Sequence, residues 1–170
     1  MKLLTYKLKG DDKERLGMMC SFAFHRFIPI EDLGLHFRDM NDLIQNMTRE
    51  QRTILEHACE KPNKRLLCYE DVVRCAPIPH PRQDIICLGL NFRDHAVESS
   101  RFKKEEFNQE RPYAVYFSKR VNEATPDGGC IPSYPGLVDS LDYEAELAVI
   151  IGKEAKDVKK EDAFDYVFGY

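Results

Sequence analysis

The sequence predicts an α+β protein built from a small α/β unit and a strand-rich segment that follows it. The first unit is indicated by apolar residues at helical spacing that lie between strand-like segments. The second is indicated by runs of β-branched and aromatic residues that begin near residue 85. A proline-rich stretch, Pro77–Pro81, separates them, because each proline fixes its own φ and restricts the residue before it. We therefore place one domain at residues 1–76 and another at residues 77–170.

In the first domain the pattern predicts strands on both sides of two helices. Apolar residues recur at helical spacing from Asp39 to Met47. The segment Thr48–Gln51 has the form of a capping box, which starts a second helix that we expect to end near Lys61–Pro62. No catalytic pattern is visible in the sequence of this domain. Strands are expected at residues 2–8, 18–24 and 72–76, with a turn-bounded connector at residues 27–34.

The second domain is expected to contain strands joined by segments of different character. Residues 85–89 predict a buried strand, and residues 113–117 predict another. The highly charged stretch at residues 99–111 fits either a mobile surface segment, such as a lid, or a solvated helix. Residues 122–136 are rich in proline and glycine, which predicts a loop, and residues 159–168 predict a short helix before a glycine.

Two glutamates, Glu144 and Glu146, stand before the apolar run Leu147–Ile151. The β-branched content of this run predicts a strand, in which residues two apart project from the same face. Adjacent carboxylates repel each other, which raises one pKa unless a hard divalent cation is bound between them. On spacing alone, the simpler explanation is a strand with two solvated glutamates. The alternative is half of a Mg²⁺ or Mn²⁺ site.

A histidine and a glutamate follow the strand predicted at residues 85–89. If Asn91 or Asp94 caps a helical turn, His95 and Glu98 stand at positions i and i+3, where the carboxylate is close enough to orient the imidazole. Such a pair is suited to act as a general base toward a water molecule. As an isolated pattern, an ion pair on a helix surface explains the spacing more simply.

Composition excludes several classes of partner. The net charge of −4 and a pI near 5.8 give no electrostatic footprint for nucleic acid. No stretch reaches the roughly 18 apolar residues of a membrane helix, and the N-terminal residues lead into a charged segment instead of a signal-peptide core. The six cysteines form no Cys-x-x-Cys pair, which is typical of buried thiols in a reducing compartment. We therefore expect a cytoplasmic protein with no nucleic-acid and no membrane partner.

Four blocks in the second domain carry a specific resemblance. They are Ile86–Glu98, Tyr113–Lys119, Leu141–Lys153 and Asp162–Tyr170, and together they resemble the fumarylacetoacetate hydrolase family. The resemblance implies a small N-terminal α/β domain followed by part of a mixed β-roll. That arrangement fits the domain boundary placed after residue 76.

The resemblance also implies a chemistry, because members of this family act on 2-oxo and acylpyruvate-type acids with a divalent metal. It implies that Glu144 and Glu146 are ligands of Mg²⁺ or Mn²⁺, and that His95 with Glu98 activates a water molecule. Lys119, which matches a lysine of the family, and Arg93 are the side chains expected to bind the acidic substrate. The implied reaction is hydrolysis of a carbon–carbon bond in an acylpyruvate-type 2-oxo acid that resembles fumarylacetoacetate or fumarylpyruvate, in aromatic or amino-acid catabolism.

The resemblance leaves alternatives for the reaction. Related members isomerise or decarboxylate 2-oxo or 2-hydroxy-dienoic diacids, and a noncatalytic, truncated chain is a further alternative. In the family a third metal ligand, an aspartate, follows the segment that ends here at Gly169–Tyr170, so these residues supply two of three expected ligands. We also expect a homodimer, because apolar residues flank the Glu144–Glu146 segment.

Overall fold

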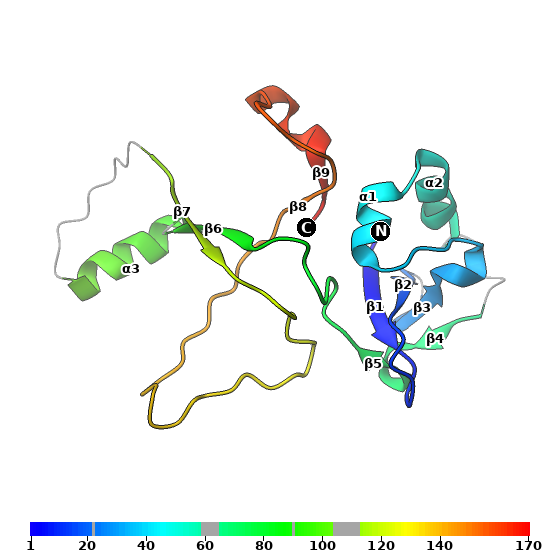
Figure 1. Cartoon of the computed structure of the whole chain (residues 1–170), viewed down its shortest axis with the longest axis horizontal. Helices are drawn as coiled ribbons and strands as arrows, with labels where there is room; N and C mark the ends of the chain where they lie inside the picture. Colours follow the sequence, from blue (N-terminus) through cyan, green and yellow to red (C-terminus); the bar gives the residue numbers. More distant parts are fainter. Residues whose placement is uncertain (22, 59–64, 90, 104–112) are drawn as a thin grey trace. The chain divides into compact units, whose positions relative to one another are not determined.

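The computed structural model describes residues 1–21, 23–58, 65–89, 91–103 and 113–170 of the chain (Figure 1). The chain divides into two compact units. The first unit contains Met1–Pro79 together with Thr125–Tyr170, and the second contains His80–Ala124.

An antiparallel sheet of five strands, in the order β4-β3-β2-β1-β5, is the base of the first unit. The turn between β1 and β2 is closed by the Asp11 N–H, which donates to the Leu8 carbonyl at 3.0 Å, and it places Gly10 at a φ of 82° that favours glycine. The strand predicted at residues 2–8 is confirmed, whereas the one expected at residues 18–24 begins earlier and ends at Met19. The strands are β1 (Leu3–Lys7), β2 (Arg15–Met19), β3 (Arg26–Pro29), β4 (Leu67–Cys68) and β5 (Val73–Arg74).

The two faces of this sheet carry separate apolar clusters, because alternate residues of a strand point to opposite sides. On one face Leu16 and Met18 of β2 pack with Leu43 of helix α1 (Met40–Asn46) and Leu55 of helix α2 (Arg49–Ala58). On the other face the buried cluster consists of Leu4, Tyr6, Phe27 and Val72.

The second cluster depends on a glycine in the middle of β2. Tyr6 and Phe27 meet edge to face, with ring centroids 4.8 Å apart. A Cβ atom at Gly17 would lie 2.6 Å from Cδ2 of Phe27, so the phenylalanine ring fills the space that a side chain at this position would need. The absence of a side chain at Gly17 therefore lets the Phe27 ring pack against the sheet.

The predicted helices are confirmed, and so is the capping box predicted for the second of them. The Asp39 carboxylate accepts from the Asp42 N–H at 2.8 Å and so caps α1. The capping box of α2 is complete: Thr48 Oγ1 accepts from the Gln51 N–H at 3.2 Å, and Gln51 Oε1 accepts from the Thr48 N–H at 2.9 Å. The helix end expected near Lys61–Pro62 lies outside the described residues.

The connector expected at residues 27–34 is wrong for its first half. Phe27 and Ile28 are fully buried strand residues, because β3 pairs with β2 on one side and with β4 on the other. The second half forms a short 3₁₀ helix, η1 (Ile30–Leu33), which ends at Gly34. A second 3₁₀ turn, η2 (Tyr69–Asp71), lies between β4 and β5.

The second unit is an antiparallel ribbon of β6 (Ile85–Gly89) and β7 (Val115–Lys119), with helix α3 (Arg93–Lys103) following β6. The strand predicted at residues 85–89 is confirmed, but its predicted burial is wrong, because among its residues only Cys87 is buried. Within the described part of this unit no third strand joins the ribbon, so its apolar side chains remain exposed. The strand expected at residues 113–117 lies two residues later. The charged stretch predicted at residues 99–111 is helical up to Lys103, as part of α3, and its remaining residues lie outside the described ones.

The C-terminal part of the first unit begins with the predicted loop and ends in a small ribbon. Strand β8 (Ile150–Ile151) pairs antiparallel with β9 (Val167–Gly169), and the 3₁₀ helix η3 (Lys160–Tyr166) lies between them. The short helix expected at residues 159–168 is therefore confirmed over most of its length, and its last residues are strand because they pair with β8. Phe168 packs partly buried against the cluster that contains Leu43. None of the helices in the described residues has the length and apolarity needed to cross a membrane.

Candidate functional site

The residues predicted to activate water lie on α3. His95 and Glu98 stand at i and i+3 in this helix, as the sequence predicts, and both are exposed. The helix is established before His95, because the Ala96 N–H donates to the Phe92 carbonyl at 3.0 Å. The Asp94 carboxylate lies in the first turn of α3, where a negative charge interacts favourably with the positive end of the helix dipole. The helical placement of the pair is confirmed, and its role as a base stays a prediction.

The two expected substrate-binding cations belong to the same unit but to different elements. Arg93 is the first residue of α3, and Lys119 is the last residue of β7. Lys119 pairs with Ile85 at the start of β6. The other end of β6, Gly89, leads into α3 and lies four residues away, a distance of about 13 Å along a strand. Its ammonium group lies 5.9 Å from the centroid of the Phe117 ring. Lys119 therefore lies at the end of the ribbon away from the start of α3.

The expected metal ligands lie in an extended segment instead of a strand. Glu144 and Glu146 are exposed, and the strand predicted over them is wrong, because β8 begins only at Ile150. A strand needs a neighbouring backbone for its hydrogen bonds, and in the described chain β9 pairs only with Ile150 and Ile151. The apolar residues predicted to make this strand are exposed as well, with Leu147 at 69%. The prediction that both carboxylates project from one face of a strand therefore does not hold for this segment, because Glu144 and Glu146 are not in a strand.

The donor chemistry of this segment fits a hard cation, although the described residues do not complete a site. Carboxylate oxygens are the ligands that Mg²⁺ and Mn²⁺ prefer. Among the residues that the structure describes, no three His, Cys, Asp or Glu side chains are arranged to hold a metal ion. Glu144 and Glu146 belong to the first unit, and His95 and Glu98 belong to the second. Their combination into one catalytic site is a prediction from sequence.

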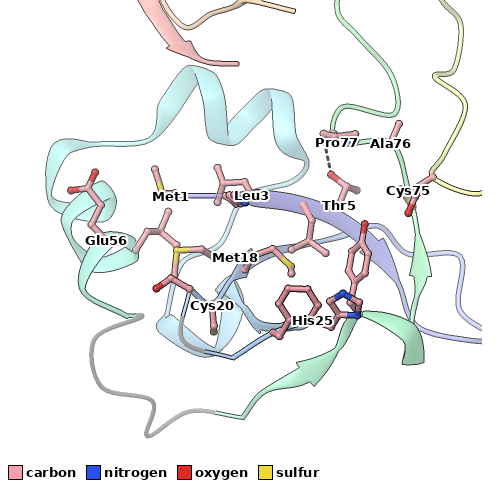
Figure 2. Close-up of a pocket in the computed structure, with 18 of the residues that line it drawn as sticks. Met1, Leu3, Thr5, Met18, Cys20, His25, Glu56, Cys75, Ala76 and Pro77 are labelled. Atoms are coloured by element: carbon pink, nitrogen blue, oxygen red, sulfur yellow. Dashed lines mark hydrogen bonds between the residues drawn. The ribbon is translucent and has the colours of Figure 1, made fainter. Parts of the chain in front are cut away.

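A cavity of about 970 Å³ in the first unit was not indicated by the sequence (Figure 2). Its walls come from β1, β2, α2 and the segments around His25 and Tyr69, and none of the predicted site residues lines it. No local spacing predicts it, because its lining is drawn from stretches far apart in the chain.

A cluster of three polar side chains lies beside this cavity. Nδ1 of His25 contacts one carboxylate oxygen of Glu70, and the Cys68 thiol donates to the other at 2.8 Å. These contacts, with the Cys68 hydrogen bond as the largest cause, lower the pKa of Glu70 to about 2. Glu70 therefore remains ionised at neutral pH.

Three comparisons with known proteins bear on this chain. A family model described as fumarylacetoacetate (FAA) hydrolase C-terminal matches residues 84–170, a span that includes all six predicted site residues. Oxaloacetate tautomerase YisK of Bacillus subtilis (strain 168) is 42% identical over 115 residues, which cover 65% of this chain and 36% of that protein. An uncharacterized protein of Staphylococcus aureus (strain USA300) is 34% identical over 104 residues, which cover 61% of this chain and 32% of that protein.

A solved structure matches the fold along the whole chain. Fumarylacetoacetate hydrolase from psychrophilic Exiguobacterium antarcticum aligns with a TM-score of 0.64 and 22% sequence identity, over 100% of this chain and 53% of that one. At this identity the match shows the fold alone, which is the predicted α+β arrangement of a small α/β domain and part of a β-roll. The chain spans about a third of the length of the two curated relatives named above.

Proposed function

Because the chain belongs to the fumarylacetoacetate hydrolase family, we propose that it acts on small 2-oxo acids and interconverts the keto and enol forms of a diacid such as oxaloacetate. The observation that carries this choice is the 42% identity to a relative named oxaloacetate tautomerase. The tautomerase is one form of the isomerase alternative that the sequence left open.

In this proposal the side chains of the second unit move the proton. His95 accepts the proton from the carbon next to the oxo group while the oxo oxygen takes up a proton from water, so no carbon–carbon bond breaks. In the reverse direction, ketonisation, the enol oxygen loses its proton to water and His95 returns a proton to that carbon. Glu98, one helical turn away on α3, orients the imidazole and is therefore a positioning residue. Arg93 and Lys119 are proposed to bind the carboxylates of the diacid, because an acidic chain needs local positive charge to hold an anion.

Glu144 and Glu146 are the residues proposed to hold a divalent cation, Mg²⁺ or Mn²⁺. When bound, such a cation would polarise the oxo group and make the neighbouring carbon more acidic. The exposure of both carboxylates leaves them accessible to an ion from solvent.

Hydrolysis of an acylpyruvate is the second candidate, and the name of the matched family favours it. Here His95 would accept a proton from water, the water oxygen would attack the distal carbonyl, and the carbon–carbon bond would break to release pyruvate and a carboxylic acid. A decarboxylase would instead release CO₂ from oxaloacetate. The predicted homodimer, the cytoplasmic location and the domain boundary after residue 76 stay predictions.

Product analysis separates these reactions. The 170-residue chain with Mg²⁺ is mixed with the enol form of oxaloacetate, and the loss of enol absorbance is followed beside assays for CO₂ and, with acetylpyruvate and fumarylpyruvate, for pyruvate. We expect faster ketonisation without CO₂ or acylpyruvate cleavage. Pyruvate with a carboxylic acid from an acylpyruvate would support hydrolysis instead, and no turnover of any substrate would reject catalysis by this chain.

Exchange of the proposed base tests the role of α3. His95→Ala should reduce the ketonisation rate by roughly 10²–10⁴-fold, the usual contribution of a general base. His57→Ala on α2 is the matched control, because His57 is also an exposed helical histidine. An unchanged rate in His95→Ala would assign proton transfer to another group.

Exchange of a proposed ligand tests the metal. Glu144→Gln should weaken the Mg²⁺-dependent rise in melting temperature, whereas Glu154→Gln, an exposed glutamate in the same part of the chain, should preserve it. Equal rises in the two variants would reject Glu144 as a ligand, whatever their activities.

A further inference from the structure

The segment that carries Glu144 and Glu146 is attached on both sides to the part of the first unit formed by residues 1–79. Residues 130–149 are exposed, and in the described chain they belong to no strand and no helix. Before them Asp127 contacts β5, and after them Phe168 contacts the apolar cluster that contains Leu43. All of these residues belong to one compact unit. The order of the glutamate segment therefore depends on these two attachments.

The attachment before the segment is an ion pair. One carboxylate oxygen of Asp127 lies 2.5 Å from the guanidinium of Arg74 on β5. That guanidinium also lies over the Tyr69 ring, 5.2 Å from its centroid. Both charged side chains are partly exposed to solvent, so a pair of this kind contributes little free energy. It is the weaker of the two attachments.

The ribbon of β8 and β9 fixes the backbone directly after the segment. Ile150, four residues after Glu146, begins β8 and pairs with Gly169 of β9. The Gly152 N–H donates to the Tyr166 carbonyl at 2.8 Å, which extends the contact between the two sides of the ribbon. The backbone is therefore restricted only four residues from the second glutamate.

Phe168 ties this ribbon to the apolar core. It is a partly buried residue of β9 and packs against the cluster that contains Leu43. A Cβ atom at Gly152 would lie 2.9 Å from Cβ of Phe168, so the backbone after β8 passes directly beside this side chain. Burial of an aromatic side chain contributes more than an exposed ion pair does. Phe168 is therefore the stronger attachment and the one nearer to the glutamates.

The attachments matter for a cation because ordering a flexible segment has a cost. If the segment moves freely, it loses conformational freedom when its carboxylates close on an ion, and this loss lowers the affinity. A backbone that is already fixed four residues from Glu146 has less freedom to lose. Affinity for the ion should then depend on a side chain that never touches it.

We infer that Phe168 is a positioning residue for the cation ligands: through β9 and β8 it orders the segment of Glu144 and Glu146 and so raises its affinity for Mg²⁺ or Mn²⁺. The inference rests on the proposed function, because it takes these two glutamates as the ligands. It gives the apolar core of residues 1–76, in which the sequence shows no catalytic pattern, a part in the site.

The test compares two phenylalanines of the C-terminal part of the chain. Phe164, on η3, is the control, because it is 77% exposed and is not among the residues that pack against the cluster. The 170-residue chain with Phe168→Ala or Phe164→Ala is titrated with Mn²⁺, and the free ion is measured by electron paramagnetic resonance. We expect Phe168→Ala to bind Mn²⁺ about 2- to 12-fold more weakly than the control, the usual factor for ordering one side chain on binding. Equal affinities would overturn the inference.

A second pair of variants applies if circular dichroism shows that Phe168→Ala does not fold. Gly152→Ala displaces Phe168 without removing it, whereas Gly169→Ala on β9 meets nothing within 4 Å. Weaker Mn²⁺ binding in Gly152→Ala than in Gly169→Ala would then support the inference, and equal binding would overturn it.

A third variant separates positioning from a general loss of stability. Thr48→Ala removes a capping hydrogen bond of α2 in the same unit, without contact to β8 or β9. It should keep the Mn²⁺ affinity of the unaltered chain. Without the ion, the heteronuclear NOE of the amides of residues 147–149 should fall in Phe168→Ala and stay unchanged in Thr48→Ala. The same NOE in both variants, or an equal loss of affinity, would overturn the positioning role.

Glu144→Gln shows which of the two proposals fails. If this variant keeps the Mn²⁺ affinity of the unaltered chain, the proposed cation site is rejected. If it loses affinity while Phe168→Ala keeps it, the cation site stands and the positioning role of Phe168 is overturned.

Discussion

Residues 1–76 and residues 84–170 both contain strongly apolar strand sequences, but only the first stretch buries them. Phe27, Leu43 and Leu55 have no exposed surface, and they belong to the two clusters on the faces of the five-stranded sheet. In the described part of residues 84–170, Cys87, at 7% exposed, is the only buried apolar residue. Ile86 at 67% and Tyr116 at 65% show the contrast.

The residues that carry the family match and the residues that stabilise the fold lie in different stretches of the chain. The family match and all six predicted site residues lie in residues 84–170. The buried apolar surface, which supplies most of the free energy of folding, lies in residues 1–76. Variants in the first stretch should therefore change the free energy of unfolding far more than equivalent variants in the second.

The largest expected change in the free energy of unfolding comes from replacing one phenylalanine by alanine in each stretch. Phe27→Ala should reduce the free energy of unfolding by about 3–5 kcal/mol, because it empties a fully buried position beside Tyr6. Phe117→Ala on β7 should cost less than about 1 kcal/mol, because that ring is already 44% exposed. Urea denaturation followed by circular dichroism measures both. Similar losses in the two variants would show that the ribbon is buried in solution and would remove the contrast.

A smaller effect is expected from adding a methyl group at two glycines. Gly17→Ala would place its Cβ 2.6 Å from Phe27 Cδ2, and the shift needed to accommodate it should cost about 1–3 kcal/mol. Gly169→Ala on β9 meets nothing within 4 Å and should leave the free energy of unfolding nearly unchanged. The same denaturation experiment applies. A neutral Gly17→Ala would mean that the Phe27 ring moves aside freely.

Local patterns predicted well where the responsible contacts are local. The Thr48–Gln51 capping box lies within four residues, and both of its hydrogen bonds are present. The helical spacing of His95 and Glu98 was predicted for the same reason. Local pattern did not predict β3, because its strand character comes from pairing with β2 on one side and, on the other, with β4, where Phe27 pairs with the sequence-distant Leu67.

The segment with the predicted metal ligands also shows that local pattern alone does not predict strand pairing. Residues Leu147–Val149 have strand-like side chains, but in the described chain the ladder with β9 starts only at Ile150. Side-chain pattern indicates that a segment favours a strand, whereas a strand forms only where a second backbone supplies hydrogen bonds. The His25–Glu70 contact likewise joins residues 45 positions apart, so no spacing rule could have found it.

Removal of a cap should have a moderate effect confined to the first stretch. Thr48→Ala removes the side chain that accepts from the Gln51 N–H, and it should cost about 1 kcal/mol of the free energy of unfolding. Thr53→Ala in the middle of α2 is the matched control, because its hydroxyl only donates back to the Arg49 carbonyl and alanine favours the helix. A larger loss in the control than in Thr48→Ala would contradict the role of the capping box.

The smallest expected effect is a pH dependence that arises from Glu70. Its pKa is lowered from 4.5 to about 2, first by the Cys68 hydrogen bond and then by His25, so the folded state favours the ionised carboxylate. A lowered pKa stabilises the folded protein above the ordinary value, and this contribution is lost as the pH falls from about 4.5 to about 2. Glu70→Gln should therefore flatten the pH profile of the unfolding midpoint in that window, and Cys68→Ala should flatten it partly, because it removes the larger cause. If both variants kept the pH profile of the unaltered chain, Glu70 would not be the source of the acid sensitivity. Other carboxylates would then be responsible, such as Asp11 or Asp42, whose pKa values are also lowered by hydrogen bonds.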